Sequence, residues 1–563
     1  STENTYDAIV IGSGISGGWA AKELCEQGLK TLVLERGRNV EHIKDYPTAT
    51  KAPWEFPHRG QMTKEFLTAN PLISKAAGFG EDTAHFFIKD SDHPYVQEKP
   101  FEWIRGYQVG GKSLTWGRAC QRWSPFEFLA PTRFDYGIAW PIDYEKVAPW
   151  YGHVEKFIGV CGTKDGIEAM PDGEFLPPFD LNCVEAHMQQ TIKKSYTDRH
   201  LVPARWAQLT QPTELHTAQG RGRCQARNLC MRGCPYGGYF SSNSATLPWA
   251  KKTGNLTIRP HSVVHSIIYD EQKQKAIGVR LIDANTMQPL EVFAKVIFVN
   301  AAALNSNLIL LNSTSKRFPN GLGNDSGLLG KYIMFHNYRA SVGGDLDGFE
   351  DKYFYGRNPT EPIIANYRNL HKQDTDYVGG FTTFMGAYRG QVEEKNLPET
   401  IGGAYKDALC EPGGWHVYMY MQGETIPKET NHVRLSTDQK DKWGIPLLVT
   451  SVGYDDNDEK MVKDFLTQSA DMLAKAGCKN IAQRDNKQAP GLDIHEMGGV
   501  RMGSDPKTSL LNEWNQLHHC KNVFVTDGAC MTSTGNQSPS ILYMALTARA
   551  ATHAVSELKK GAL

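Results

Sequence analysis

The chain has 563 residues, of which 40% are hydrophobic and 22% are charged. This length exceeds what one hydrophobic core normally covers, so we expect two or more packed units and no long disordered region. The 61 Lys and Arg residues balance 62 Asp and Glu residues, which leaves no broad basic surface for nucleic acid.

The chain carries no apolar run near the roughly 20 residues that span a bilayer, so we expect no direct membrane span. Residues 1–7 lack the basic and apolar parts of a secretory signal. Export remains open on this reading, either after removal of a leader or alongside a partner that carries the signal.

Residues 6–37 predict a β-α-β unit. The motif Gly12-Ser-Gly14-Ile-Ser-Gly17 follows an apolar strand and opens an amphipathic helix that Gly28 is placed to end. Glu35 ends the next strand, where a carboxylate accepts hydrogen bonds from ribose hydroxyls. The glycines let backbone amides approach a pyrophosphate at the helix N-terminus. The unit therefore predicts a dinucleotide site, without separating NAD from FAD.

The remaining elements follow in chain order. Polar, Pro-containing sequence from about 38 to 100 predicts long surface excursions. Strands near 256–259, 262–268, 294–300 and 522–526 are expected to complete the nucleotide-binding sheet. The Tyr- and Gly-rich segment 340–490 predicts an antiparallel sheet that forms a substrate domain. An Ala-rich helix over about 540–558 follows Ser538-Pro539, a suitable N-cap and first-turn pair.

Three of the 11 cysteines, Cys224, Cys230 and Cys234, lie within eleven residues of one another. Gly and Pro in this segment allow a loop to wrap around a metal centre. The absence of a nearby fourth thiol or His disfavours a closed zinc site, whereas a 3Fe-4S cluster needs three thiolates. A zinc ion with a distant fourth ligand, or three unrelated thiols, remain as alternatives.

Three further motifs resemble signatures of the glucose-methanol-choline (GMC) oxidoreductase family. Arg105-Gly-Tyr-Gln-Val-Gly110-Gly111-Lys-Ser113-Leu-Thr115-Trp116-Gly117 is similar to its first flavin-contact signature, and the segment 298–311 is similar to its second. The segment 495–503, followed by Val525-Thr-Asp527-Gly528, resembles its C-terminal block. The resemblance implies FAD, and Thr115 at the position of a flavin-linking His implies noncovalent attachment.

The resemblance also assigns residues to the cofactor and to catalysis. The implied FAD-binding residues are Gly12, Gly14, Gly17, Glu35, Arg36, Gly110, Gly111, Ser113, Thr115, Trp116, Val264, Ala301, Asp527 and Gly528. His495 matches the catalytic base, which takes the hydroxyl proton while hydride leaves for flavin N5. The second catalytic residue is either Ser538, which aligns with the family's Asn, or Asn536 two positions earlier. His336 is interpreted as structural.

The implied fold is α/β (α+β overall), a Rossmann-like FAD-binding domain with a second domain on a largely antiparallel sheet. We expect residues 1–170, 215–340 and 490–563 in the FAD-binding domain, including the cysteine loop 221–240. Residues 171–214 and 341–489 form the expected substrate-binding domain.

The cysteine spacing resembles large subunits of bacterial FAD-dependent sugar dehydrogenases, in which a 3Fe-4S cluster relays electrons. That resemblance implies a small accessory subunit, a c-type cytochrome acceptor and a periplasmic location, with a cytoplasmic one still open. Segments 45–60, 201–208 and 240–248 look like the glucoside 3-dehydrogenase branch, which oxidises the C3 hydroxyl of glucose and glucosides to 3-keto sugars. Three alternatives remain: a dehydrogenase of another sugar or sugar acid (glucose C1, gluconate), an FAD-retaining lyase, and a zinc-binding module.

Overall fold

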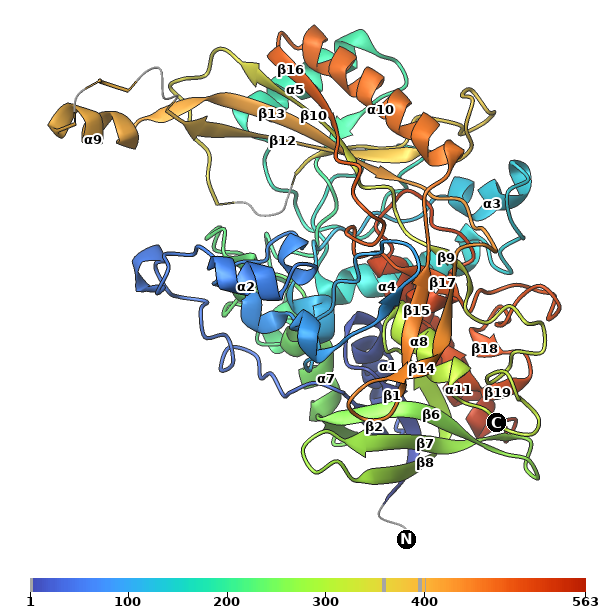
Figure 1. Ribbon diagram of the computed structural model, residues 1–563. Helices are drawn as coiled ribbons and strands as arrows, with labels where there is room; N and C mark the ends of the chain where they lie inside the picture. The colour runs from blue at the N-terminus through green and yellow to red at the C-terminus, as the bar shows by residue number, and fades with distance from the viewer. Residues whose placement is uncertain (1–3, 357–360, 393–396, 400) are drawn as a thin grey trace.

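The N-terminal β-α-β unit is the start of a parallel sheet. Strand β1 (Thr5–Ile11) leads into α1 (Ile15–Glu26) and returns to β2 (Thr31–Leu34), which pairs parallel with β1. Gly28 follows the helix with φ +91°, a conformation that glycine adopts at little cost, so the predicted helix end is confirmed. The computed structural model describes residues 4–356, 361–392, 397–399 and 401–563 (Figure 1).

Distant segments complete this sheet as expected. Its order is β18-β19-β8-β1-β2-β5, and β6 and β7 extend it as an antiparallel pair beside β8. These strands are β5 (Leu256–Arg259), β6 (Ser262–Asp270), β7 (Lys275–Asp283), β8 (Pro289–Val299), β18 (Gln516–Leu517) and β19 (Cys520–Val525). Helix α11 (Ser540–Lys559) packs against α1 and α4 (Tyr144–Ile158).

The expected cap of the last helix is wrong. Pro539, not Ser538, is the N-cap of α11, and no side chain caps that helix end. The Ser538 hydroxyl instead donates to Gln422 Oε1 at 3.3 Å, and Gln422 belongs to the second sheet, which is described next. Ser538 is thereby directed away from its own helix.

The second sheet is antiparallel and lies at the other end of the molecule (Figure 1). Helices α5 (Cys183–Ser195) and α10 (Asp456–Lys475) pack on one of its faces, against a core rich in Met and Val. Its strands, in spatial order, are β16 (Lys479–Asp485), β10 (Ala340–Leu346), β13 (Pro412–Gly423), β12 (Phe381–Gln391), β11 (Ile363–Ile364) and β4 (Leu201–Val202).

A third, five-stranded sheet lies between the other two. Its order is β17 (Met497–Gly499), β9 (Lys331–Met334), β14 (His432–Lys440), β15 (Pro446–Ser451) and β3 (Val96–Gln97). Strands β14 and β15 come from the segment 341–489 but pair with strands outside it. The chain thus passes between the two expected domains several times. The domain boundaries themselves stay a prediction.

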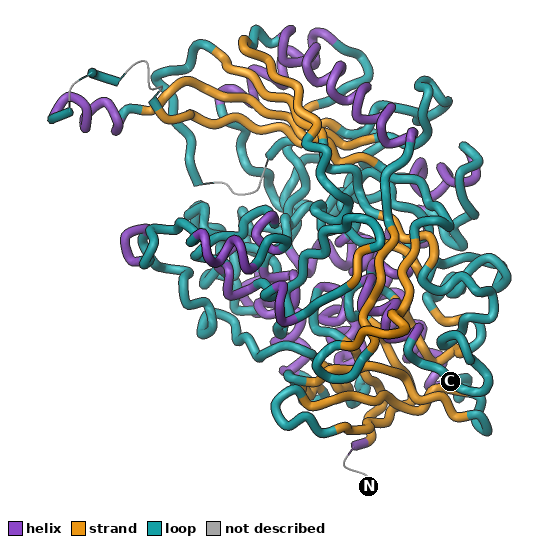
Figure 2. The backbone as a smooth tube through the Cα atoms, viewed as in Figure 1, coloured by secondary structure: helices purple, strands orange, loops and turns teal. Residues whose placement is uncertain are grey.

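The rest of the described chain is helices and loops. Residues 38–100 run over the surface with short helical turns, as expected (Figure 2). The other α-helices are α2 (Lys64–Ala69), α3 (Pro125–Arg133), α6 (Glu214–Ala218), α7 (Leu247–Lys252), α8 (Ala303–Leu311) and α9 (Gly403–Cys410). Across the described ranges, no helix is both long enough and apolar enough to span a membrane.

Candidate active site

A cavity of about 610 Å³ extends from the carboxyl ends of the first parallel strands to the six-stranded sheet. Gly12 and Glu35 line one end, at the crevice where open α/β sheets bind ligands. Tyr420 and Gln422 on β13 line the other end. His495 lies on the wall as well. One cavity therefore joins the predicted dinucleotide site, the predicted base and the second sheet.

Most of the predicted cofactor residues line this cavity. They are Gly12, Gly14, Glu35, Arg36, Gly111, Ser113, Thr115, Trp116, Val264, Ala301, Asp527 and Gly528. Gly17 and Gly110 do not line it. A Cβ on Gly17 would collide with the Gly12 carbonyl and one on Gly110 with the Asn243 amide, so both glycines act through close backbone packing.

The cavity fits a polar dinucleotide. Gly14 and Gly117 face open space, with no atom within 4 Å of a Cβ added at either position. Several buried polar atoms on the wall lack a protein partner, including Arg36 Nε, Asn300 Oδ1 and Tyr543 OH. Since buried polar groups are normally hydrogen-bonded, these atoms indicate a ligand that supplies the missing partners.

Two buried carboxylates mark the ends expected for a ribose and a diphosphate. Glu35 accepts hydrogen bonds from Ser13 Oγ at 2.5 Å and from the Gly37 amide at 2.9 Å. Asp527 accepts from Ser306 Oγ at 2.5 Å, and burial raises its pKa to about 6. Burial raises the pKa of Glu35 as well. Hydroxyl donors of a bound ribose would stabilise the ionised form of Glu35.

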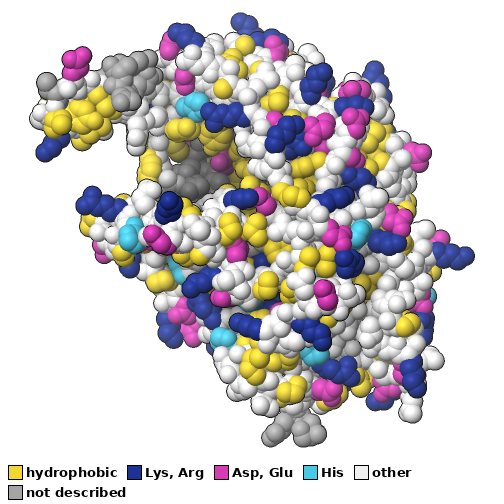
Figure 3. Space-filling view, in the orientation of Figure 1, with side chains coloured by type: hydrophobic (Ala, Val, Ile, Leu, Met, Phe, Trp, Pro, Cys, Tyr) yellow, Lys and Arg dark blue, Asp and Glu magenta, His cyan; other side chains and the backbone are white. Residues whose placement is uncertain are grey.

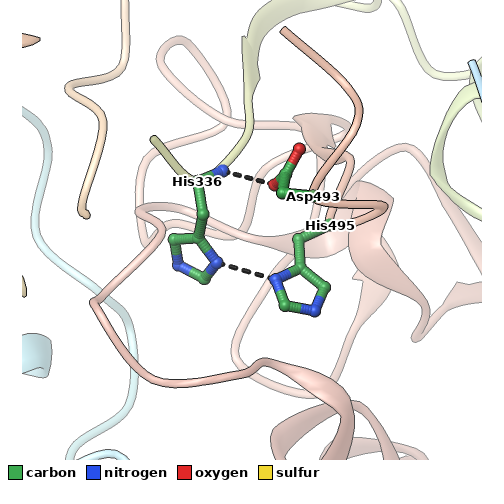
Figure 4. Close-up of side chains that lie close together, drawn as sticks. All are labelled: His336, Asp493 and His495. Carbon is green, nitrogen blue, oxygen red and sulfur yellow. Dashed lines mark hydrogen bonds between the residues drawn. The ribbon is translucent and has the colours of Figure 1, made fainter. Parts of the chain in front are cut away.

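Strand register brings two histidines together. Met334 of β9 pairs with Met497 of β17 in an antiparallel ladder. His336 follows the first strand by two residues and His495 precedes the second by two, so the same register sets the two imidazoles opposite each other. Their Nδ1 atoms lie 2.9 Å apart (Figure 4). Ile494, just before His495, holds φ +63°, a strained conformation of the kind that clusters at functional sites.

The hydrogen bonds determine the tautomer of each ring. His336 Nε2 lies 2.9 Å from the Gly535 carbonyl and 3.3 Å from the Thr534 carbonyl, so this nitrogen carries a proton and donates. In a neutral ring Nδ1 of His336 is then an acceptor, and Nδ1–H of His495 donates to it. This leaves Nε2 of His495 without a proton and able to accept one.

Both imidazoles are held neutral. Burial lowers the pKa of His336 to about 4. Burial, assisted by the neighbouring His336 and by the Lys112 ammonium, lowers the pKa of His495 well below 6.5. A neutral imidazole with an unprotonated Nε2 is the form that general-base chemistry requires.

The two histidines and Asp493 are also arranged as a possible cation site, since their ligand atoms lie within 4.8 Å of one another. Asp493 Oδ2 accepts from the His336 amide at 2.7 Å, and burial raises the pKa of Asp493 to about 7. The 2.9 Å Nδ1···Nδ1 contact, however, requires a proton between the nitrogens. A cation would have to displace that proton, so the arrangement favours a base.

The two candidates for the second catalytic position are placed differently. Ser538 lines the cavity, whereas Asn536 does not. The Asn536 amide accepts from Thr382 Oγ1 at 2.8 Å and donates to Glu127 Oε1 at 3.2 Å, which engages both of its ends. Asn536 is therefore placed to brace the loop, and Ser538 is the one that faces the reaction space.

The far end of the cavity is aromatic and acidic. Tyr338, Phe384, Tyr420 and Gln422 line it together with Glu361. The basic residues on the described wall are Arg36, Arg105, Lys112 and Arg118, all from the segments that surround the predicted cofactor. A convergent Lys or Arg pair for an anionic substrate is thus absent from the described residues at this end.

The predicted metal ligands lie on one loop beside the cavity. Cys224, Cys230 and Cys234 do not line the cavity, but Met231 between them does. The Gly238 amide donates to Cys234 Sγ at 3.4 Å, and burial raises the pKa of the Cys224 and Cys230 thiols. Within the described ranges, these sulfurs do not all lie within 4.8 Å of one another.

Comparisons with known proteins identify the family. The N-terminal model of the GMC oxidoreductases matches residues 6–336 and the C-terminal model matches residues 427–547. The chain belongs to the GMC oxidoreductase family. It is accordingly an FAD-binding oxidoreductase with the Rossmann-like α/β architecture expected from the sequence.

Several characterised family members match nearly the whole chain. The 2-methyl-1,2-propanediol dehydrogenase of Mycolicibacterium austroafricanum is 28% identical, covering 97% of this chain and 94% of that protein. The fructose dehydrogenase large subunit of Gluconobacter japonicus is 25% identical, covering 99% and 98%. Formate oxidase of Aspergillus oryzae RIB40 has a similar solved structure, with TM-score 0.61, 13% identity and 99% coverage of both chains.

Sequence reasoning missed several residues of this site. His336 was interpreted as structural, but it contacts the predicted base directly. Asp493 and Gln422 were not singled out, although Asp493 lies two residues before His495. Only the pairing of β9 with β17 and the approach of β13 to the loop 534–538 make these contacts visible.

Proposed function

We propose that the protein is a dehydrogenase that oxidises the C3 hydroxyl of glucose or a glucoside to a 3-keto sugar. FAD would be bound noncovalently, and electrons would leave through a 3Fe-4S cluster to a cytochrome or another acceptor. The observation that carries the proposal is the unprotonated Nε2 of His495, which lies on the cavity shared by the dinucleotide motif and the second sheet.

The residues support alcohol oxidation. His495 is placed to remove the hydroxyl proton, and Ser538 can hold the substrate oxygen from the same wall. Bound FAD would supply the hydride acceptor. Gly111 and Trp116 line the same cavity as the dinucleotide motif and His495, so both are placed to contact a bound cofactor.

The composition of the substrate end supports a neutral polyol. Glu361 and the tyrosine hydroxyls accept and donate hydrogen bonds to sugar hydroxyls, while a carboxylate substrate would be repelled by Glu361. This favours glucose or a glucoside over gluconate. Another neutral sugar or another carbon of glucose remains the second candidate, because the relatives include a fructose dehydrogenase.

The cysteine loop supports electron transfer out of the protein. Met231 lines the cavity, whereas Cys224, Cys230 and Cys234 lie on the same loop outside it, so a cluster on these cysteines would lie beside the cavity wall. Such a cluster would divide a two-electron reduction into single-electron steps. We further propose a small accessory subunit, a c-type cytochrome acceptor and a periplasmic location, the last to be tested by cell fractionation.

Anaerobic titration of the purified protein with glucose and a methyl glucoside tests the reaction. We expect bleaching of the flavin absorbance and a product whose new carbonyl is at C3. A carbonyl at C1 would contradict the regiochemistry. Failure of any sugar to bleach the flavin would contradict the dehydrogenase and favour the lyase.

Replacement of Cys230 by Ser tests the relay. We expect sugar to reduce the flavin as before, while electron transfer to cytochrome c is lost and bound iron falls. Cys410→Ser is the matched control, because Cys410 is exposed on α9. Unchanged transfer in Cys230→Ser, or zinc in place of iron by elemental analysis, would refute the cluster.

A further inference from the structure

The six-stranded sheet has two chemically different faces. On β13 the residues Trp415, Val417, Met419 and Met421 are at most 1% exposed and belong to the core that packs against α10 and α5. The alternate residues His416, Tyr418, Tyr420 and Gln422 point to the other face, because successive side chains of a strand alternate. This second face borders the catalytic cavity.

Aromatic rings form a continuous strip along that second face. Phe384 stacks on Tyr420 with ring centres 5.0 Å apart and planes 8° apart. Tyr420 is in turn nearly parallel to Tyr418, at 6.3 Å and 9°. Tyr388 continues the strip at 6.0 Å from Tyr418. Phe384 and Tyr420 line the cavity, whereas Tyr388 is 50% exposed, so the strip leads outward from the site.

The strand register makes room for flat rings. Gly386 of β12 and Gly343 of β10 flank Tyr418 on its two sides. A Cβ on Gly386 would collide with the Tyr418 hydroxyl, and one on Gly343 would lie 2.9 Å from His416 Nε2. Gly386 therefore leaves room for the Tyr418 ring over β12, and Gly343 leaves room for the His416 ring over β10.

Hydrogen-bonding groups accompany the rings. The Tyr418 hydroxyl donates to Glu361 Oε1 at 3.1 Å, and Asp345 Oδ1 lies 3.0 Å from His416 Nδ1 at the outer end. Aromatic faces bordered by carboxylates suit a ligand with apolar C–H surfaces and many hydroxyls. The space-filling view shows the molecule hollowed beside this sheet, with hydrophobic side chains around the opening (Figure 3).

We infer that this strip, Phe384, Tyr420, Tyr418 and Tyr388, binds a second sugar ring attached to the sugar that is oxidised. The inference rests on the proposed function for the reacting ring, and it adds a disaccharide or longer glycoside as the preferred substrate class. A second ring on Tyr418 and Tyr388 would hydrogen-bond to the carboxylates beside them. Binding energy from such a remote ring can be used to orient the reacting one.

The test compares cellobiose with methyl β-glucoside in the FAD-loaded protein. We expect Tyr388→Ala and Tyr418→Ala to lower the ratio of kcat/KM for cellobiose to that for methyl β-glucoside by about tenfold, the effect of one aromatic contact. Tyr418→Phe, which keeps the ring, should retain most of the ratio. Tyr353→Ala is the matched control, since Tyr353 is 66% exposed and outside the strip. A ratio unchanged within about twofold in both alanine variants would overturn the inference.

A binding measurement separates this inference from the proposed function. The dithionite-reduced protein cannot oxidise sugar, so calorimetric titration with cellobiose reports binding alone. Weaker cellobiose binding in Tyr388→Ala, together with absent sugar oxidation in the wild type, would refute the dehydrogenase function but support sugar binding by the strip. Normal sugar oxidation, with equal cellobiose binding in wild type and Tyr388→Ala, would refute sugar binding by the strip but support the dehydrogenase function.

Discussion

The two ends of the cavity are built by different means. At the cofactor end, residues 12–16 of one short segment line the wall, and Gly12 and Gly17 are required because the chain approaches itself closely at these two positions. At the catalytic end, side chains from β13 and from the segments around 336, 493–495 and 538 meet. The first end therefore depends on local backbone geometry and the second on the register of strands far apart in the sequence.

The largest effect is expected from Gly12→Ala at the cofactor end. Gly12 has φ +99°, and an added Cβ would collide with the Asn300 carbonyl. We expect the purified variant to lack flavin absorbance and all activity. Gly28→Ala is the control: it shares a positive φ without a close neighbour, so about 1–2 kcal/mol of stability is lost and the flavin stays. A Gly12→Ala protein that retains flavin absorbance and activity would contradict the claim that close backbone packing at Gly12 is required for FAD binding.

At the catalytic end, His495→Ala should lower the rate of flavin reduction by sugar by about 10²–10⁴-fold, the usual contribution of a general base. Flavin content should stay normal, because the change is confined to the other end of the cavity. His200→Ala, at an exposed histidine, serves as the control in stopped-flow measurements. A rate within tenfold of wild type would show that another group takes the proton.

His336 is expected to act through His495, as a positioning residue. His336→Leu removes the acceptor for Nδ1–H, so the proton can shift to Nε2 and block the base; we expect kcat to fall about 10²-fold with KM little changed. His336→Gln can accept and donate in place of the ring and should recover most of this loss. Equal losses in Leu and Gln variants, with normal thermal stability, would argue against tautomer control.

Asn536 and Ser538 are expected to have different roles: Asn536 supports the structure of the loop, and Ser538 contacts the substrate. Asn536→Ala removes the hydrogen bonds of Asn536 to the buried Glu127 Oε1 and Thr382 Oγ1, so we expect a stability loss of about 1–3 kcal/mol. Ser538→Ala should instead lower kcat/KM a few-fold with stability near wild type, since Ser538 lines the cavity. Thermal unfolding and steady-state kinetics of both variants decide the assignment. Reversed effects would make Asn536 the substrate contact.

The smallest effect is expected from pH. Because the pKa of His495 lies well below 6.5, its neutral form persists as the pH falls through the ordinary histidine range. In an Asp493→Asn background, which removes the neighbouring carboxyl whose pKa burial raises to about 7, we expect kcat/KM for the sugar to change less than about twofold between about pH 6.5 and 8. A loss of activity centred near pH 6.5 would indicate that the base titrates as an exposed imidazole does.

The sequence by itself determined the family, the FAD-binding architecture and the β-α-β unit. Each of these depends on local order along the chain: glycine spacing, strand and helix periodicity, and an acidic residue at a strand end. The antiparallel character of the second sheet was also predictable, from its Tyr- and Gly-rich segments.

Only the tertiary structure decided how the catalytic groups meet. His336 and His495 are 159 residues apart and come together through the pairing of β9 with β17. Ser538 contacts Gln422 of β13 and Asn536 contacts Thr382 of β12, so both contacts join the loop before the last helix to the six-stranded sheet. The aromatic strip follows from the pairing of β12 with β13. Local propensity contains no information on such register, because it is set by packing between elements that a single sequence does not align.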